Sequence, residues 1–173
     1  SGYDTWDDLT ANVEPISENV IRPPEDLATI IYTSGTTGMP KGVMHKFYNF
    51  SFASTHAINT VKVGPDDKFF SYLPLCHIAE KILVEMGGIY SGGRVDFAES
   101  LESFAQNLSY SSPTVFLGVP RIWAKFQQGI LGKLPQKKMD MLLGIPILGG
   151  LIKKKVRKGL GLNNAKNVFT GAA

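Results

Sequence analysis

Cysteine and histidine are scarce in this chain of 173 residues, which has one cysteine and three histidines. The single thiol, that of Cys76, cannot form a disulfide within the chain, and no cluster of cysteine and histidine has the spacing of a zinc site. The sequence therefore assigns no metal ligand of its own. It also excludes the small proteins that depend on disulfides or structural zinc for their stability.

Long apolar runs are missing too, although 43% of the residues are hydrophobic and 19% are charged, as in ordinary globular proteins. No run approaches the ~20 apolar residues that cross a bilayer, and no secretory signal opens the chain. This composition predicts a globular unit that is cytoplasmic, or peripheral on a membrane surface. Because the chain opens with Ser-Gly and has no initial Met, we expect it to be an internal piece of a longer protein.

Acidic residues are almost absent from the last third of the chain. Residues 121–173 carry 11 Lys/Arg and one acid, Asp140, whereas residues 1–120 carry 7 Lys/Arg and 14 Asp/Glu. This asymmetry indicates an anionic partner for the basic third, or a solvated basic face. An apolar stretch beside a basic run at residues 139–158 suits peripheral membrane contact, but a buried helical hairpin with a solvated basic end is the interpretation we favour. No aromatic residues alternate with the lysines of residues 153–158, so we expect no nucleic-acid partner.

Segments of strand length alternate with segments of helical periodicity through most of the chain. Residues 1–26 are acidic and contain three prolines, which predicts a lead-in linker with a short helix, capped by Asp4, Asp7 or Asp8. Residues 27–173 then form the partial domain, an α/β fold with a layered, mainly parallel sheet flanked by helices. The expected strands are 28–32 (buried), 43–44, 68–73 (buried), 94–97, 114–119 and 166–170; the expected helices are 50–61 with Asn49 as N-cap, 78–90, 101–110 and one from 120.

A loop rich in glycine and hydroxyl residues follows the first expected strand, between Tyr32 and Gly42. Glycine lets backbone N–H groups converge on a phosphate, the hydroxyls add donors, and the lysine adds a positive charge. The pattern is neither a Walker A loop nor a dinucleotide fingerprint, and a mobile surface turn is the structural alternative. The candidate phosphate-binding residues are Thr33, Ser34, Gly35, Thr36, Thr37, Gly38 and Lys41.

A histidine follows the expected strand 68–73, at the place where Pro74 ends it. The carboxyl ends of strands in α/β proteins face the ligand crevice, so His77 lies where a site residue is expected. A structural histidine is the alternative, and Glu80 reads as no more than a charge in the first turn of the next helix. Trp123 is expected to pack rather than to contact a ligand.

The string Tyr-Thr-Ser-Gly-Thr-Thr-Gly-x-Pro-Lys-Gly resembles the phosphate loop of the adenylate-forming enzymes. The segments 73–81 and 113–123 resemble the long-chain fatty acyl-CoA synthetase branch of that family. The resemblance implies that His77, the catalytic candidate, lies beside the acyl carboxylate and the adenylate. It also implies that the final turn packs against adenine and the acyl group, a turn formed by Gly171, Ala172 and Ala173.

This resemblance, which extends from about Asp26 to Ala173, implies part of the large N-terminal domain of a long-chain fatty acid–CoA ligase. Such an enzyme joins a fatty acid to ATP as an acyl-adenylate and then transfers the acyl group to coenzyme A, releasing pyrophosphate and AMP. ATP or AMP, Mg²⁺ and coenzyme A (as substrate) are the expected cofactors. The family motifs for Mg²⁺ and ribose are expected beyond Ala173, so we expect the isolated chain to be inactive. A ligase for another carboxylic acid, a non-catalytic nucleotide-binding module and a scaffold domain are the alternatives.

Overall fold

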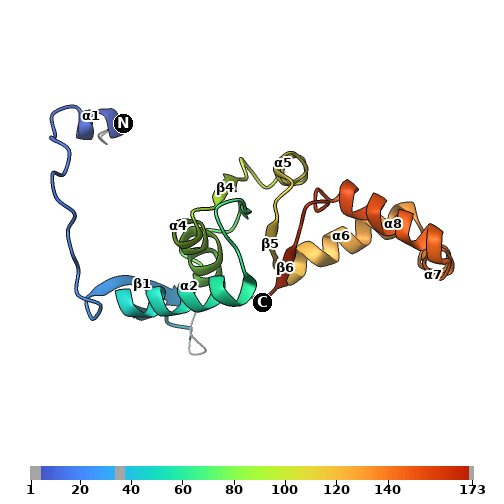
Figure 1. Cartoon of the computed structure of the whole chain (residues 1–173), viewed down its shortest axis with the longest axis horizontal. Helices are drawn as coiled ribbons and strands as arrows, with labels where there is room; N and C mark the ends of the chain where they lie inside the picture. The colour runs from blue at the N-terminus through green and yellow to red at the C-terminus, as the bar shows by residue number, and fades with distance from the viewer. Residues whose placement is uncertain (1–4, 34–37, 172–173) are drawn as a thin grey trace.

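The computed structural model describes residues 5–33 and 38–171, which form two separate sheets and the helices around them (Figure 1). The elements along the chain are α1 (Trp6–Thr10), β1 (Leu27–Thr33), β2 (Lys41–Lys46), α2 (Phe47–Val61), β3 (Lys68–Ser71), α3 (Ile78–Glu80), the π-helical segment η1 (Lys81–Met86), α4 (Gly87–Ser91), β4 (Arg94–Phe97), α5 (Phe104–Ser111), β5 (Val115–Gly118), α6 (Pro120–Lys133), α7 (Gln136–Leu143), α8 (Pro146–Gly159) and β6 (Asn167–Thr170).

The main sheet has four strands in the order β4-β3-β5-β6, and every neighbouring pair is parallel. Helical segments connect each strand to the next, as parallel pairing requires. The predicted α/β fold with a parallel sheet is therefore confirmed. In the paired register Ser71 lies opposite Phe97, and Gly118 lies opposite Thr170, so the carboxyl ends of the four strands meet at one edge.

The first two strands form a hairpin of their own instead of joining the main sheet. β1 pairs antiparallel with β2, and Thr33 lies opposite Lys41 at the turn. The strand at 28–32 is confirmed, but its predicted burial is wrong, because Ile31 is its only buried residue while Ile30 and Tyr32 are exposed. An apolar strand is buried only when other elements of the protein cover both faces of its sheet. Within the described residues, the β1–β2 sheet is not covered in this way.

Aromatic side chains fill the core between the main sheet and the helices on one of its faces. Phe70 and Phe116, on the two central strands, are buried, and Phe104 of α5 closes over Phe70 edge-on at 5.7 Å between ring centroids. Trp123 of α6 meets Phe116 edge-on at the same separation. Edge-to-face pairs of this kind stabilise a core beyond their burial alone, so these rings fix the strand ends on which the site is built.

Two helix starts differ from the sequence-based predictions. α1 begins after Thr5, whose Oγ1 accepts from the Asp8 N–H at 3.2 Å, while the Asp8 carboxylate accepts from the Thr5 N–H at 2.9 Å. Thr5, not an aspartate, is therefore the N-cap, and Asp4 lies outside the described residues. α2 begins at Phe47, and Asn49 caps it from the first turn by accepting the Lys46 N–H at 2.8 Å, so Asn49 as N-cap is wrong.

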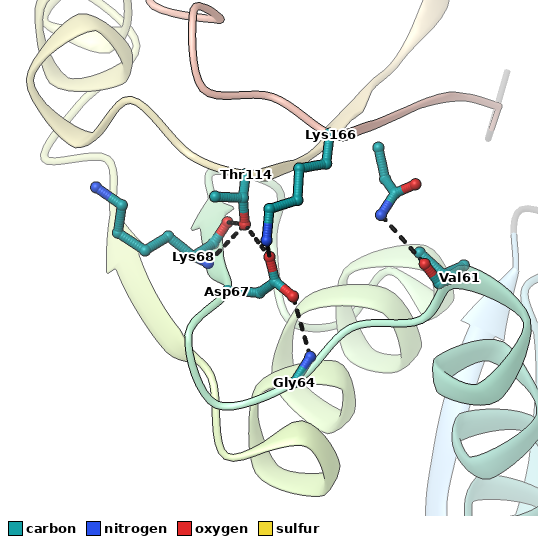
Figure 2. A network of polar contacts seen from close by, with 7 residues as sticks. Val61, Gly64, Asp67, Lys68, Thr114 and Lys166 are labelled. Carbon is teal, nitrogen blue, oxygen red and sulfur yellow. Dashed lines mark hydrogen bonds and ion pairs between the residues drawn. The ribbon is translucent and has the colours of Figure 1, made fainter.

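A buried aspartate joins the amino ends of three strands at the edge opposite the site (Figure 2). The Asp67 carboxylate accepts from Thr114 Oγ1 at 2.7 Å, from Lys166 Nζ at 2.9 Å and from the Gly64 N–H at 3.0 Å. Burial alone raises the pKa of Asp67, but the three hydrogen bonds and the Lys166 charge outweigh it and leave the pKa below its ordinary value of 3.8.

Replacing Asp67 with Asn is expected to lower the free energy of unfolding by about 1–2 kcal/mol at pH 7, because charge-assisted hydrogen bonds are lost. The native carboxyl has the lower pKa, so its contribution is present above pH ~4 and disappears as the pH falls towards the native pKa. Urea unfolding between pH 7 and pH 3 measures both effects. The exposed neighbour substitution Asp66→Asn is the control, and equal losses in the two variants would contradict this prediction.

Candidate functional site

The carboxyl edge of the main sheet carries two of the described candidate residues, His77 and Gly171, while Thr33, Gly38 and Lys41 belong to the separate β1–β2 hairpin. β3 leads to His77, β5 leads into α6, and β6 leads to Gly171. Tyr72, just after β3, ties two of these ends together, because its Oη accepts the Val119 N–H at 3.0 Å. Burial raises the pKa of Tyr72, so its hydroxyl stays neutral and keeps this contact over the physiological range.

His77 caps the helical segment that follows β3. Its Nδ1 accepts the Ala79 N–H at 3.2 Å, which satisfies one of the free donors at the start of α3. A neutral ring with Nδ1 as acceptor carries its proton on Nε2. The half-buried ring therefore has one nitrogen engaged in the cap and one N–H available as a donor to a ligand oxygen.

Glu80, one turn after His77, is the buried acid of this edge. Its side chain has 0% exposure, so its interpretation as a simple first-turn charge is wrong. The carboxyl lies near Ser71 and the backbone of Tyr72 and Leu73, yet neither oxygen reaches hydrogen-bonding geometry with a described residue. Burial raises the pKa of Glu80 against the smaller opposing effects of these neighbours and His77. Perturbed acids of this kind are typical of functional sites.

The helix that carries these two residues is irregular. α3 continues directly into η1, a π-helical segment from Lys81 to Met86, before α4 resumes the regular pitch. In η1 the Lys81 ammonium pairs with the Glu85 carboxylate at 2.9 Å, so this charge is not directed at Glu80. π-helical insertions occur frequently at functional sites, which agrees with the position of this one beside His77.

An open groove of about 630 Å³ lies between α6 and β6, beside the same edge. Trp123 is both packed and exposed to this groove: its Nε1 donates to the Gly118 carbonyl at 2.8 Å, and a Cβ on Gly118 would come within 2.5 Å of the indole. Glycine is therefore required at this strand end. The sequence did not indicate the groove, which is lined by Pro120, Trp123, Ala124, Gln127, Val168, Phe169 and Thr170.

The glycine-rich loop is the turn of the β1–β2 hairpin. Thr33 and Lys41 are exposed partners on its two strands, and Gly38 has φ +83°, a conformation that favours glycine. Among the described residues, a Cβ on Gly38 would meet no atom within 4 Å. The other four candidate residues of the loop, Ser34, Gly35, Thr36 and Thr37, lie outside the described residues, as do Ala172 and Ala173 at the end of the chain.

The described residues suit a nucleotide better than a divalent cation. The Thr33 hydroxyl and the Lys41 ammonium belong to directly paired positions of the two strands, and both groups are donors of the kind that bind phosphate oxygens. Within residues 5–33 and 38–171, no three His, Cys, Asp or Glu side chains lie close enough together to hold a metal ion. The Mg²⁺ that the family resemblance implies therefore has no ready set of ligands among these residues.

Comparison with known proteins gives a match over nearly the whole chain. The family model described as "AMP-binding enzyme" matches residues 3–164. The long-chain-fatty-acid–CoA ligase ACSBG2 of Xenopus laevis is 35% identical over 182 aligned positions, which cover 87% of this chain and 25% of that protein. The chain thus spans about a quarter of the length of the curated relatives it matches.

Solved structures agree with this result. The adenylation domain of a carboxylate reductase from Mycobacterium chelonae is 26% identical and superposes with a TM-score of 0.68, covering 92% of this chain and 25% of that one. O-succinylbenzoate coenzyme A synthetase from Bacillus subtilis, solved with AMP, is 26% identical with a TM-score of 0.54, covering 62% of this chain and 22% of that one. The fold and the sequence therefore point to the same group of proteins.

Proposed function

The chain belongs to the AMP-binding enzyme family, and on that premise we propose that it is part of an ATP-dependent long-chain fatty acid–CoA ligase. We propose residues 27–173 as the partial adenylation domain and residues 1–26 as its lead-in linker. Coenzyme A enters the proposal as a substrate.

One observation carries the proposal: His77, Gly171 and the α6–β6 groove all adjoin the carboxyl edge of one parallel sheet. Ligands of open α/β sheets bind at that edge. The groove wall is largely apolar, with Trp123, Val168 and Phe169, which suits an alkyl chain rather than a charged acid. We therefore assign the fatty acyl chain to this groove and its carboxylate to the end nearest Gly171.

In the first half-reaction the fatty acid carboxylate attacks the α-phosphorus of ATP, forming a P–O bond while the bond to pyrophosphate breaks. The task of the protein is to align these groups and to neutralise the phosphate charge. We assign the β- and γ-phosphates to the loop from Thr33 to Lys41, and the carboxylate to the Nε2–H of His77. The turn Gly171–Ala173 is assigned to adenine and the acyl group, where small residues allow close approach.

In the second half-reaction the thiol of coenzyme A attacks the acyl carbonyl carbon, and the bond to AMP breaks. A thioester forms, AMP leaves and the thiol proton is released. Because the chain spans about a quarter of its relatives, we expect binding without turnover from the chain alone. Formation of acyl-CoA by the purified chain would contradict this expectation.

The alternative functions differ in the ligands that the groove and the glycine-rich loop would bind. A ligase for an aryl, amino or short-chain acid would keep the loop and use the groove differently. A non-catalytic nucleotide-binding module would bind ATP with no effect of an acyl group. The largely apolar groove favours an acid with an apolar tail over a short-chain or polar acid, and a module that binds only nucleotide has no use for it; an aryl acid would also suit this wall.

Calorimetric titration of the chain with ATP tests the assignment of the loop. We expect Lys41→Ala to weaken ATP binding about tenfold, or ~1.4 kcal/mol, because a charge-assisted contact to phosphate is lost. His77→Ala is expected to leave ATP binding unchanged and to weaken binding of a non-hydrolysable acyl-adenylate analogue. The two variants therefore separate the phosphate and acyl parts of the site.

Matched controls come from residues of the same type outside the site. Lys133, exposed at the end of α6, controls for Lys41, and His56, exposed on α2, controls for His77. If Lys41→Ala and Lys133→Ala behave alike, the loop does not bind phosphate. If neither ATP nor the analogue binds or raises the Tm, the chain is a scaffold and the proposed site is wrong.

The proposed setting of the reaction is the cytoplasm, with peripheral contact to a membrane through residues 139–158. Long-chain fatty acids partition into bilayers, at about 0.8 kcal/mol per buried methylene. A ligase at the bilayer surface therefore meets its acid at a higher local concentration than one in free solution.

A further inference from the structure

The α7–α8 hairpin projects from the rest of the molecule and forms one of its extremities, joined to the sheet by α6 (Figure 1). The helical hairpin predicted from the sequence is present, but its predicted burial is wrong. Gly149 is its only buried residue, and it packs so closely on Leu143 that a Cβ would lie 2.7 Å from the Leu143 carbonyl oxygen. The two helices thus pack on each other through a small contact and leave their outer surfaces free in the described part of the chain.

Large apolar side chains gather at the turn of this hairpin. We call this surface the apolar tip; it comprises Met141 (64% exposed), Ile145 (46%), Ile147 (83%), Leu148 (36%) and Leu151 (59%). Isolated exposed leucines are normal on a protein, but five large apolar residues exposed within eleven positions form a cluster at one hairpin turn, and clustered exposed apolar side chains mark interaction sites.

Lysines surround the other end of the same two helices. The basic band comprises Lys137, Lys138, Lys153, Lys154, Lys155 and Lys158, all of which are exposed. Asp140 is the one acid in the hairpin, and its carboxylate accepts a hydrogen bond from Gln136 at 2.7 Å. The basic band belongs to the C-terminal half of α8 and the first turn of α7, so along the hairpin it lies farther from the turn than the apolar tip does.

The outer face of α8 carries apolar residues near the hairpin turn and lysines farther along the helix. Ile147, Leu151, Lys154 and Lys158 follow helical spacing on one face, whereas Gly149, Ile152 and Val156 face the other way and are buried or half-buried. At 1.5 Å per residue, Ile147 lies about 10 Å along the axis from Lys154. Apolar residues of interfacial helices enter a membrane by about 5–10 Å, which places such lysines at the headgroups.

We propose that the α7–α8 hairpin docks on an anionic lipid bilayer, with the apolar tip inserted at the acyl boundary and the basic band against the headgroups. Charge complementarity decides the occupant, because the hairpin offers a strong positive charge directly behind an apolar surface. A nucleic acid would use the basic band and leave the apolar tip in water. No helix in the described residues has the length and apolar composition to cross a membrane, so the contact is a surface insertion.

Vesicle sedimentation with the whole chain tests this proposal. We expect binding to phosphatidylcholine vesicles that contain about one third phosphatidylserine, and at least tenfold weaker binding to phosphatidylcholine alone. Raising the salt concentration should weaken the binding. The substitution Ile147→Trp places a fluorescent reporter in the apolar tip, and its emission should shift to the blue when the anionic vesicles take up the tip. The native tryptophans, Trp6 and Trp123, lie outside the hairpin, so the unsubstituted chain gives the background emission.

Two multiple substitutions to glutamine test the contributions of the apolar tip and the basic band separately, with little change in helix propensity. The pair Ile147→Gln and Leu151→Gln removes part of the apolar tip, and the set Lys154→Gln, Lys155→Gln and Lys158→Gln removes part of the basic band. Each is expected to weaken vesicle binding about tenfold or more. The controls are Ile21→Gln, at a residue that is 92% exposed far from the hairpin, and the pair Lys125→Gln and Lys133→Gln. Circular dichroism checks that every variant is folded.

Several outcomes would overturn the proposal: no binding to anionic vesicles, equal binding by the tip variant, or equal binding to neutral vesicles. Self-association that the tip variant abolishes, seen by ultracentrifugation without vesicle binding, would assign the tip to a second copy of the chain. The proposal rests on the peripheral membrane contact named in the proposed function and specifies its surface, but it does not depend on the ligase reaction. Loss of vesicle binding with intact ATP binding, or the reverse, therefore distinguishes its failure from that of the proposed function.

Discussion

Replacing Phe116 with Ala is expected to lower the free energy of unfolding by about 3–5 kcal/mol, which is enough to unfold a marginally stable domain. The ring has 0% exposure and lies in the centre of the aromatic core. Its neighbours are Tyr72 at 6.1 Å, Trp123 at 5.7 Å and Phe126 at 6.5 Å between ring centroids. Rigid strands on both sides limit how far the cavity can collapse, so the full cost is expected.

Urea unfolding followed by circular dichroism measures this loss, and near-ultraviolet dichroism reports the packing of Trp123. Phe97→Ala is the matched control, because Phe97 lies on β4 of the same sheet but is 70% exposed. Its loss should stay near or below 1 kcal/mol. If the two variants unfold at the same urea concentration, the aromatic core does not hold the strand ends together as described.

The main sheet could be predicted because its strands carry their own signal. Phe69 and Phe70 lie in a short apolar run that ends at Pro74, and the run at 114–119 is equally apolar and β-branched, so both were predicted and both are buried. The hairpin strand at 28–32 carries the same signal in a different setting. Its composition predicts a strand correctly, but burial depends on the layers around it, which the local sequence does not contain.

The parts of the site that follow from local sequence were predicted, and the parts that depend on distant residues were not. The glycine-rich loop and His77 were candidates because each lies at the end of a strand. The groove needs α6 and β6 side by side, although more than thirty residues separate Ala124 from Val168, so no local pattern indicates it. The sequence predicts no more for Glu80 than a charge in the first turn of a helix, where acids are common, whereas its carboxyl is buried against Ser71 and the backbone of Tyr72 and Leu73 at the end of β3.

Replacing the buried Glu80 with Gln is expected to raise the free energy of unfolding by about 1–3 kcal/mol at pH values above the native pKa of this carboxyl. Neither carboxyl oxygen has a hydrogen-bond partner among the described residues, so losing the proton there is costly, whereas a neutral amide of the same shape does not ionise. The folded pKa lies above the ordinary value of 4.5. The contribution of the protonated Glu80 carboxyl to stability is therefore fully present below pH ~4.5 and is lost as the pH rises through its native pKa.

Urea unfolding of the unsubstituted chain and of the Glu80→Gln variant, from pH 4 to pH 8, measures this pH dependence. The gain from Glu80→Gln should be small at pH 4, where the carboxyl is protonated in both states, and should reach its full value above the native pKa. Glu85→Gln is the control, because Glu85 lies on the same helix but is paired with Lys81 and should show no such gain. A gain that is independent of pH would mean that shape, not charge, limits stability here.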